Sequence, residues 1–404
     1  MATFSMAVIV AAAGTPLALY ADYLGLAGVT TTTLAMSTGT YFLAAAAALF
    51  FLGRLSDILG RKWLGLSALL LAAVGTFALI FVTGPVQLLL GRTLQGAASG
   101  LAASALASWV ADSAPAHPGR TAAATAGAPL LGFTSGALWS AALVQSVPQH
   151  PALPYVIAIA LLTLAACAIV FCPDSVRRQP LATASLRPRL AVDHRAKPLL
   201  LGAAAVIATT WAFGSFLQAF TPVIASQQLS LNNRVVMTAV IVTFVFSNAL
   251  AGALAGRLTA SSAVRGGTLV FALSLSAVTL SLAGRAAVGV FLSVAGAGIG
   301  AGAGSTGSLR ILLVRTSPAR RASLFSATSL IAYGGSSLPG FISGEFEAWA
   351  GIVPLTGLYA LAAFAALVVG WRMSRRSEHE TRGAFDLTTE PVNAAPAPGT
   401  NPAS

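Results

Sequence analysis

Residues Gly53–Lys62 read GRLSDILGRK and decide the fold of this chain. This polar segment contains three cations and one acid, and it separates two apolar runs, Thr31–Leu52 and Trp63–Val82. Each run is about twenty residues long, which at about 1.5 Å of rise per helical residue matches the roughly 30 Å hydrocarbon core of a bilayer. The segment therefore predicts a tight turn between two membrane-spanning helices, held at the cytoplasmic face by its cations.

The composition predicts an integral membrane protein. Only 8% of the 404 residues are charged, 56% are hydrophobic, and the mean hydropathy is +0.81, whereas a soluble domain carries about 25% charged residues. A net charge of +12 would suggest a nucleic-acid partner in a soluble chain. Here the cations sit in short loops between apolar runs, which is the pattern of membrane topology. We therefore expect a lipid bilayer, and no nucleic acid, as the partner.

Apolar runs between polar breaks predict twelve membrane spans, so the expected fold is an all-α membrane protein. The positions of the polar breaks place the spans at Ser5–Tyr23, Thr31–Leu52, Trp63–Val82, Val86–Val110, Thr121–Val144, Leu153–Phe171, Leu199–Ile224, Val235–Gly256, Gly267–Gly284, Ala286–Val314, Ala322–Ile342 and Val353–Trp371.

The cations give the expected orientation. Of the 23 Lys and Arg residues, all but Arg92, Arg234, Arg285 and Arg310 fall on one side when the spans alternate from a cytoplasmic N-terminus. Cytoplasmic loops carry such an excess of Lys and Arg. The pattern predicts a multi-pass protein of the plasma (inner) membrane with both termini in the cytoplasm.

The two halves of the chain resemble each other at an offset of about 200 residues. Thr15-Pro16 in the first span matches Thr221-Pro222 in the seventh, and Gly53-Arg54-Leu55 matches Gly256-Arg257-Leu258. Such repeats occur in many secondary transporters, with the substrate site between them. The expected organisation is two pseudo-symmetric six-helix bundles at 1–172 and 199–372, a cytoplasmic linker at 173–198 and a disordered cytoplasmic tail at 373–404.

Two motifs resemble signatures of the major facilitator superfamily. GRLSDILGRK is similar to its loop signature between helices two and three, and Arg92-Thr-Leu-Gln95-Gly96 resembles the Arg-x-x-Gln-Gly signature common in its drug-efflux branches. The segment 132–140, GFTSGALWS, keeps only half of the Gly-x-x-x-Gly-Pro-x-x-Gly pattern of its antiporters. The resemblance implies the major facilitator fold, with transport by alternating access.

The resemblance also implies a gating role for the first motif. Its key positions are Gly53, Asp57, Gly60, Arg61 and Lys62, and the implied role is a latch that rearranges as the inner gate opens and closes. On physical grounds, Asp57 begins the third span, where a carboxylate suits a helix N-terminus. It can pair with Arg61 or Arg54. The alternative is an ordinary surface ion pair, which contributes about 0–1 kcal/mol.

Four residues are candidates for transport or coupling: Asp22, Arg92, Gln95 and Gly96. Arg92 lies inside the fourth span, where a cation costs about 2.5–3.5 kcal/mol and persists mainly beside a cavity or a polar partner. The alternative is an arginine that extends to the membrane surface. Asp22, near the outer end of the first span, is the candidate proton carrier, and its alternative is a solvated loop acid.

Polar and aromatic side chains at mid-depth predict the substrate cavity, which in this family lies between the two halves. The residues predicted to line it are Tyr20, Tyr41, Trp139, Trp211, Gln218, Asn248 and Tyr333. As a group they indicate a small hydrophobic or amphipathic substrate. A single aromatic residue among them is as well explained by packing between helices.

The sequence contains no pattern typical of an enzyme. Its four histidines, His117, His150, His194 and His379, fall in loops or in the tail, and there is no metal-spaced His/Cys cluster, paired carboxylate or nucleophile elbow. Catalytic residues, metal sites and cofactors are therefore not expected.

The predicted function is a monomeric secondary transporter that exports a drug or metabolite, with protons as the coupling ion. The alternatives are an importer, an exporter dedicated to one metabolite, and a membrane receptor.

Overall fold

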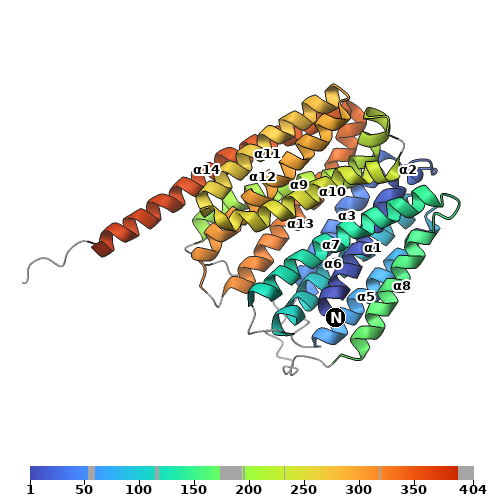
Figure 1. Ribbon diagram of the computed structural model, residues 1–404, viewed down its shortest axis with the longest axis horizontal. Helices are drawn as coiled ribbons and strands as arrows, with labels where there is room; N and C mark the ends of the chain where they lie inside the picture. The colour runs from blue at the N-terminus through green and yellow to red at the C-terminus, as the bar shows by residue number, and fades with distance from the viewer. Residues whose placement is uncertain are drawn as a thin grey trace, which may run out of the picture.

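The computed structural model describes residues 1–52, 60–113, 118–172, 193, 196–231, 233–317 and 320–389. In these ranges the chain is helical and contains no strand. Figure 1 shows the helices of the first half, blue to green, lying beside those of the second half, yellow to red. The long helix axes run roughly in one direction, as expected for segments that cross the same bilayer.

The first half contains six spans, three of which combine a regular helix with a short irregular one. The elements in chain order are α1 (Ala2–Gly14), η1 (Thr15–Leu19), α2 (Tyr20–Tyr23), α3 (Thr31–Ala47), η2 (Ala48–Leu52), α5 (Arg61–Ala78), η3 (Leu79–Phe81), α6 (Pro85–Ser113), α7 (Pro118–Ser146) and α8 (Leu153–Val170).

The second half repeats this arrangement with six further spans. They are α9 (Lys197–Val223) with η5 (Ile224–Gln228), α10 (Arg234–Leu254) with η6 (Ala255–Arg257), α11 (Ala260–Ala283), α12 (Ala287–Val314), α13 (Arg321–Ala350) and α14 (Ile352–Thr389).

The prediction of an all-α fold with twelve spans is confirmed, because every predicted span coincides with one of these helices or helix pairs. Ten of them are long and apolar enough to cross a membrane by composition alone. The other two, α6 and α13, have 29 and 30 residues and are long enough to span. They are less apolar because both are rich in Ser and Gly and, in addition, α6 contains Arg92 and Gln95 and α13 contains Glu345 and Glu347.

The Thr-Pro repeat of the sequence becomes a matching irregularity in the two halves. The first helix changes to a 3₁₀ turn at Thr15–Leu19, where the Thr15 hydroxyl donates to the Ala11 carbonyl. In the second half Pro222 lies inside α9, and a π-helical turn follows at Ile224–Gln228. Proline removes one backbone donor and disturbs the preceding turn. The first span of each half therefore departs from α-helical geometry near its predicted outer end.

Small residues allow helices of the two halves to approach closely. At the contact between α3 and α13, a Cβ on Gly340 would lie 2.7 Å from the Gly39 Cα. One turn further along, a Cβ on Gly344 would lie 2.5 Å from the Thr32 Cα. In lipid, where apolar side chains gain little by leaving their surroundings, close backbone approach is a main source of helix association. These contacts join the halves in the predicted outer part of the bundle.

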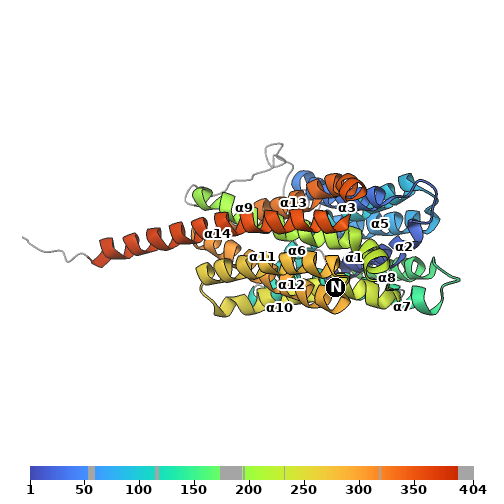
Figure 2. The same cartoon turned by 90° about the horizontal axis from the view of Figure 1, so that it is seen from above.

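The last helix differs from the prediction. It continues to Thr389 and projects beyond the bundle (Figures 1 and 2), whereas the sequence predicts a disordered tail from residue 373. Its extension is attached at its start, because Arg265 donates to Ser374 Oγ and forms an ion pair with Glu378, and Arg315 donates to the Ser377 carbonyl. These contacts order the first turns of the extension. Residues 390–404 lie outside the described part of the chain.

The close packing of α7 against α1 gives a matched test on one helix. A Cβ on Gly132 would lie 2.2 Å from the Ala7 carbonyl oxygen, whereas a Cβ on Gly127 would meet no atom within 4 Å. We expect Gly132→Ala to lower stability by about 1–3 kcal/mol through overpacking and Gly127→Ala to have little effect. Thermal unfolding of the purified proteins in detergent measures both. Equal melting temperatures for the two variants would contradict the observed helix packing.

Candidate functional site

A central cavity lies between the two halves and is the main candidate site. About 240 Å³ of it is open to the centres of water molecules. Helices α1, α3, α6 and α7 of the first half and α9, α10 and α13 of the second contribute to its walls. The lining residues are Met6, Val10, Tyr41, Phe42, Ser99, Ala102, Ala103, Pro129, Leu130, Phe133, Thr210, Trp211, Gly214, Ser215, Gln218, Ile241, Phe244, Val245, Asn248 and Tyr333.

Aromatic rings form one wall of this cavity. The Trp211 ring lies 5.8 Å from that of Tyr333 and 6.3 Å from that of Phe42, both in edge-to-face geometry. The Tyr41 ring meets Phe42 at 5.0 Å, also edge-on. Such pairs stabilise one another by about 0.5–1.5 kcal/mol beyond their burial. Trp211 nevertheless keeps 41% of its surface exposed, so this wall offers a preformed apolar face to a ligand.

Arg92 lies fully buried behind the cavity wall, with 0% of its surface exposed. Its Nη1 donates to the Ala13 carbonyl and to Gln95 Oε1, each at 2.8 Å, and its Nη2 donates to Gln218 Oε1 at 3.0 Å. The guanidinium also lies 4.5 Å from the centre of the Tyr41 ring, which allows a cation–π contact. These contacts exclude the alternative of an arginine that extends to the membrane surface.

Gln95 and Gly96, the other residues of this motif, hold the surroundings of Arg92 in place. Gln95 Nε2 donates to the Ala12 carbonyl and to Thr76 Oγ1, so the amide bridges three spans. A Cβ on Gly96 would lie 2.0 Å from the Tyr41 carbonyl oxygen, and glycine alone permits that approach. The motif therefore positions both the guanidinium and the ring against which it lies.

At the predicted outer end, an ion pair joins the halves above the cavity. Asp22 on α2 accepts two hydrogen bonds from Arg234 on α10, at 2.9 and 2.5 Å. Arg234 also donates to the Ala18 carbonyl at 3.0 Å, and its backbone N–H donates to Gln145 Oε1 on α7. The bidentate geometry is the stronger form of such pairs. Asp22 thus has a defined partner and is not a free solvated acid.

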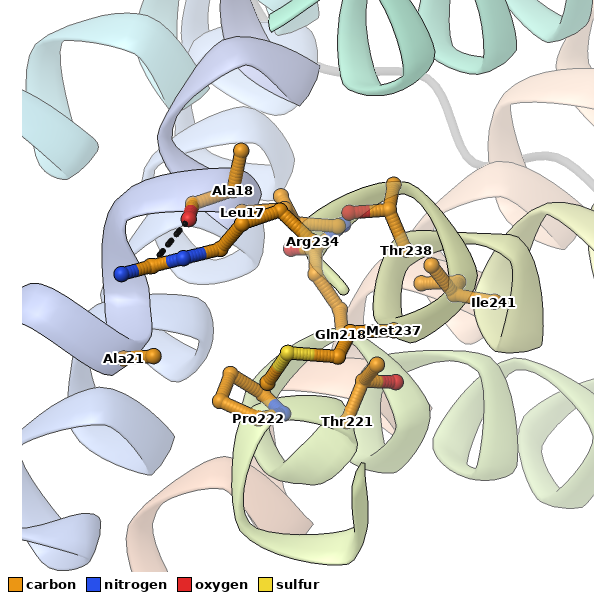
Figure 3. Close-up of a pocket in the computed structure, with 10 residues that line it drawn as sticks. All are labelled: Leu17, Ala18, Ala21, Gln218, Thr221, Pro222, Arg234, Met237, Thr238 and Ile241. Carbon is orange, nitrogen blue, oxygen red and sulfur yellow. Dashed lines mark hydrogen bonds between the residues drawn. The ribbon is translucent and has the colours of Figure 1, made fainter. Parts of the chain in front are cut away.

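A small pocket, shown in Figure 3, lies directly inside this ion pair. It is lined by Leu17, Ala18 and Ala21 of the first span and by residues of α9 and α10, including Gln218 and Arg234. Only about 10 Å³ of it is open to water centres. A further contact between the halves, from Thr31 Oγ1 to Glu347 Oε2 at 2.6 Å, lies between α3 and α13. The predicted outer end is therefore closed.

At the predicted cytoplasmic end, the polar contacts of Arg61 and Lys62 lie within the first half. Arg61 forms an ion pair with Asp112, and Lys62 Nζ donates to the carbonyls of Val170 and Cys172. Between residues that the structure describes, the hydrogen bonds and ion pairs joining the halves lie at the outer end or at the depth of Arg92. The cavity thus lies on the predicted cytoplasmic side of the closed end.

The predicted site residues fall into three groups: those that line the cavity, those that lie elsewhere, and those of the latch. Tyr41, Trp211, Gln218, Asn248 and Tyr333 line the cavity. Tyr20 and Trp139 lie elsewhere: Tyr20 is fully buried with its hydroxyl 3.3 Å from Ser37 Oγ, and Trp139 packs against the core of the first half. Of the predicted latch, Gly60, Arg61 and Lys62 are placed, whereas Gly53 and Asp57 lie outside the described residues.

Sequence reasoning missed the apolar lining residues. Phe42, Phe133 and Met6 resemble any other apolar residue of a membrane helix, and only packing decides which of them face a cavity. One signal was available for Phe42, because it directly follows Tyr41 on the second span, and this span is expected to line the central cavity. Pro129 inside α7 is a second signal, since proline within a helix disturbs packing and often marks a functional bend.

The sequence pattern of the Major Facilitator Superfamily matches residues 1–340. The chain belongs to the Major Facilitator Superfamily. No curated protein is significantly similar to it. This family consists of membrane transporters that move small molecules across the bilayer. The chain is accordingly a multi-pass membrane transporter, and its central cavity between the two halves lies where such proteins hold their substrate.

Removing the Arg92 guanidinium should destabilise this transporter. In Arg92→Leu, Ala13 O, Gln95 Oε1 and Gln218 Oε1 lose their donor, and an unsatisfied buried acceptor costs about 1–3 kcal/mol. We expect a clearly lower melting temperature than for Arg372→Leu, a matched change at an exposed position on α14. Thermal unfolding of both purified variants gives the comparison. Wild-type stability of Arg92→Leu would show that its contacts are energetically unimportant.

Proposed function

We propose that this transporter exports a small hydrophobic or amphipathic compound, a drug or a metabolite, from the cytoplasm. The observation that carries the proposal is the central cavity, whose walls are mostly apolar and aromatic with a few polar groups. Pockets of this composition bind apolar ligands and orient them through their few polar groups. The drug-efflux type of the Arg92-Gln95-Gly96 motif supports export over import.

Transport proceeds by alternating access in this proposal. The Asp22–Arg234 and Thr31–Glu347 contacts close the outer end. The described conformation therefore accepts substrate from the cytoplasmic side of the inner membrane. Release requires these contacts to break while the cytoplasmic ends of the halves come together. Rocking of one half against the other around a fixed site is the general mode for duplicated transporters. One chain contains both halves, so a monomer suffices.

Proton coupling follows as part of the same proposal. A proton that neutralises Asp22 removes one charge of its ion pair with Arg234 and favours opening of the outer end. Asp22 keeps 42% of its side chain exposed, so outside protons reach it. Net inward proton movement further requires that Asp22 release this proton to the cytoplasm, through the central cavity, before the next cycle; with that step the proton gradient drives export and the transporter is an antiporter.

Two assays test the function directly. A deletion strain and an overexpressing strain are compared for accumulation of, and tolerance to, a panel of lipophilic compounds. Export predicts lower accumulation and higher tolerance in the overexpressing strain. No change for any compound would refute export, and higher accumulation would indicate import. For an exported compound, proteoliposomes with an imposed pH gradient then test coupling, since transport that ignores the gradient excludes the proton.

Neutralising the outer ion pair should open the outer end. Leu17 lines the small outer pocket and is 7% exposed, so Leu17→Cys, in a Cys167→Ser/Cys172→Ser background, reports opening through labelling by a membrane-impermeant maleimide. We expect Asp22→Asn to increase labelling by up to about fivefold, since an exposed ion pair contributes about 0–1 kcal/mol.

Two controls make this result specific. Asp22→Asn combined with Arg234→Gln should increase labelling by less than the product of the two single effects, because both changes remove the same ion pair, although Arg234→Gln also removes the hydrogen bond to the Ala18 carbonyl. Glu345→Gln neutralises another acid near the outer end, one that is exposed on α13, and should leave labelling unchanged. Additive effects of the Asp22 and Arg234 changes would show that the two residues act separately.

The cytoplasmic latch gives a further prediction. Asp57→Asn and Arg61→Ala should leave insertion intact and greatly reduce transport, because they remove a charge interaction specific to one conformation. Asp112→Asn should reduce transport too, since Asp112 is the recorded partner of Arg61. Initial transport rates at matched expression in proteoliposomes measure this effect. Wild-type transport by all three variants would remove the latch from the mechanism.

A further inference from the structure

We infer that the central cavity selects its substrate by the sign of its charge: it accepts planar aromatic compounds with a neutral or anionic hydrogen-bond acceptor, and it rejects lipophilic cations. This inference rests on the proposed function, since it names the substrate class of the same cavity. The feature that carries it is the hydrogen bond from Arg92 to Gln218.

The contact with Arg92 fixes the orientation of the Gln218 amide. A guanidinium donates hydrogen bonds and accepts none, so the amide oxygen of Gln218 must face Arg92, as observed at 3.0 Å. The amide nitrogen then points away from Arg92. Because Gln218 lines the cavity, its two N–H groups are available there as donors. A ligand that meets this side chain must therefore offer an acceptor oxygen or nitrogen.

The charge of Arg92 is balanced by no carboxylate in the described part of the chain. Its partners are a backbone carbonyl, two amide oxygens and the face of an aromatic ring. One donor atom, Nε, is buried and has no partner. The lining residues of the cavity contain no charged side chain either. Among the described residues, the full charge that is hydrogen-bonded to a lining side chain is thus positive, and in a low-dielectric interior it repels a cationic ligand and attracts an anionic one.

The aromatic wall defines the rest of the ligand. Trp211, Tyr333 and Phe42 meet edge-to-face and leave the Trp211 ring partly exposed. A planar aromatic ligand can stack against this wall while its acceptor reaches Gln218. Aromatic rings also attract cations, so the wall alone would favour a lipophilic cation. The Arg92 charge and the Gln218 donors oppose that preference, which makes the sign of the ligand charge a decisive test.

Three probes with the same ring system vary the charge and the hydrogen-bonding group that the inference names: 2-naphthoate as the anionic acceptor, 2-naphthamide as the neutral acceptor and 2-naphthylmethylammonium as the cation without an acceptor. Their binding to the purified full-length protein is measured by calorimetry. We expect 2-naphthoate and 2-naphthamide to bind and the cation to bind at least about tenfold more weakly, because like-charge contacts are strongly unfavourable. This comparison needs only the wild-type protein and does not depend on the folding of any variant.

The isosteric change Gln218→Glu should reverse the preference. A carboxylate beside Arg92 neutralises the local charge and replaces the donors with acceptors. The affinity for 2-naphthoate should therefore fall by about tenfold, and the affinity for the cation should rise. Gln87→Glu makes the same chemical change on α6 at a residue that hydrogen-bonds to Thr83 and does not line the cavity. Its affinities for all three probes should match those of the wild type.

Two results would overturn the inference. One is wild-type affinity for 2-naphthylmethylammonium equal to or higher than that for the other probes. The other is absence of binding by both 2-naphthoate and 2-naphthamide at about 1 mM, which corresponds to a binding free energy weaker than about 4 kcal/mol. Neither result bears on whether the chain exports other compounds in the strain assay, so failure of the charge preference is distinguishable from failure of the proposed function.

Discussion

The buried charge of Arg92 is the constraint on which the rest of the site depends. A cation at this depth costs about 2.5–3.5 kcal/mol and persists only where other groups replace its hydration. The Ala13 carbonyl, the amides of Gln95 and Gln218 and the ring of Tyr41 do so here. These groups belong to α1, α6, α9 and α3, so solvation of one side chain requires four helices from both halves to lie in register.

Gln218 connects this centre to the central cavity and to the small outer pocket. Its side chain lines the central cavity and also the small outer pocket beside Arg234. Movement of α9 relative to the first half would therefore alter the partner of Arg92, the donors offered to a ligand and the packing of the outer closure together. In the described conformation the Arg92 contact, the donors in the cavity and the packing of the small outer pocket all accompany a closed outer end. The three features are linked because the Gln218 side chain takes part in each of them.

Much of the fold could be predicted because membrane helices are local structures. In lipid each backbone polar group must be satisfied within its own segment, so hydropathy alone locates Thr31–Leu52, which is helical over that whole range. Polarity within apolar spans also indicated Tyr41, Trp211 and Asn248 as cavity residues. The same signal placed Trp139 in the cavity, where it does not lie, because polarity does not tell which side of a helix faces a neighbour. The α14 extension was missed because its charged composition resembles a tail.

The sequence by itself determined that this is a membrane protein of twelve spans in two related halves, with one arginine inside the fourth span. Only the tertiary structure decided which groups meet. Arg92 and Gln218 are 126 residues apart, and Asp22 and Arg234 are 212 apart. Neither pairing leaves a local pattern, because each follows from how closely the helices of the two halves approach and how they are rotated. That geometry is set by the summed packing of small residues such as Gly39 and Gly340 across the bundle.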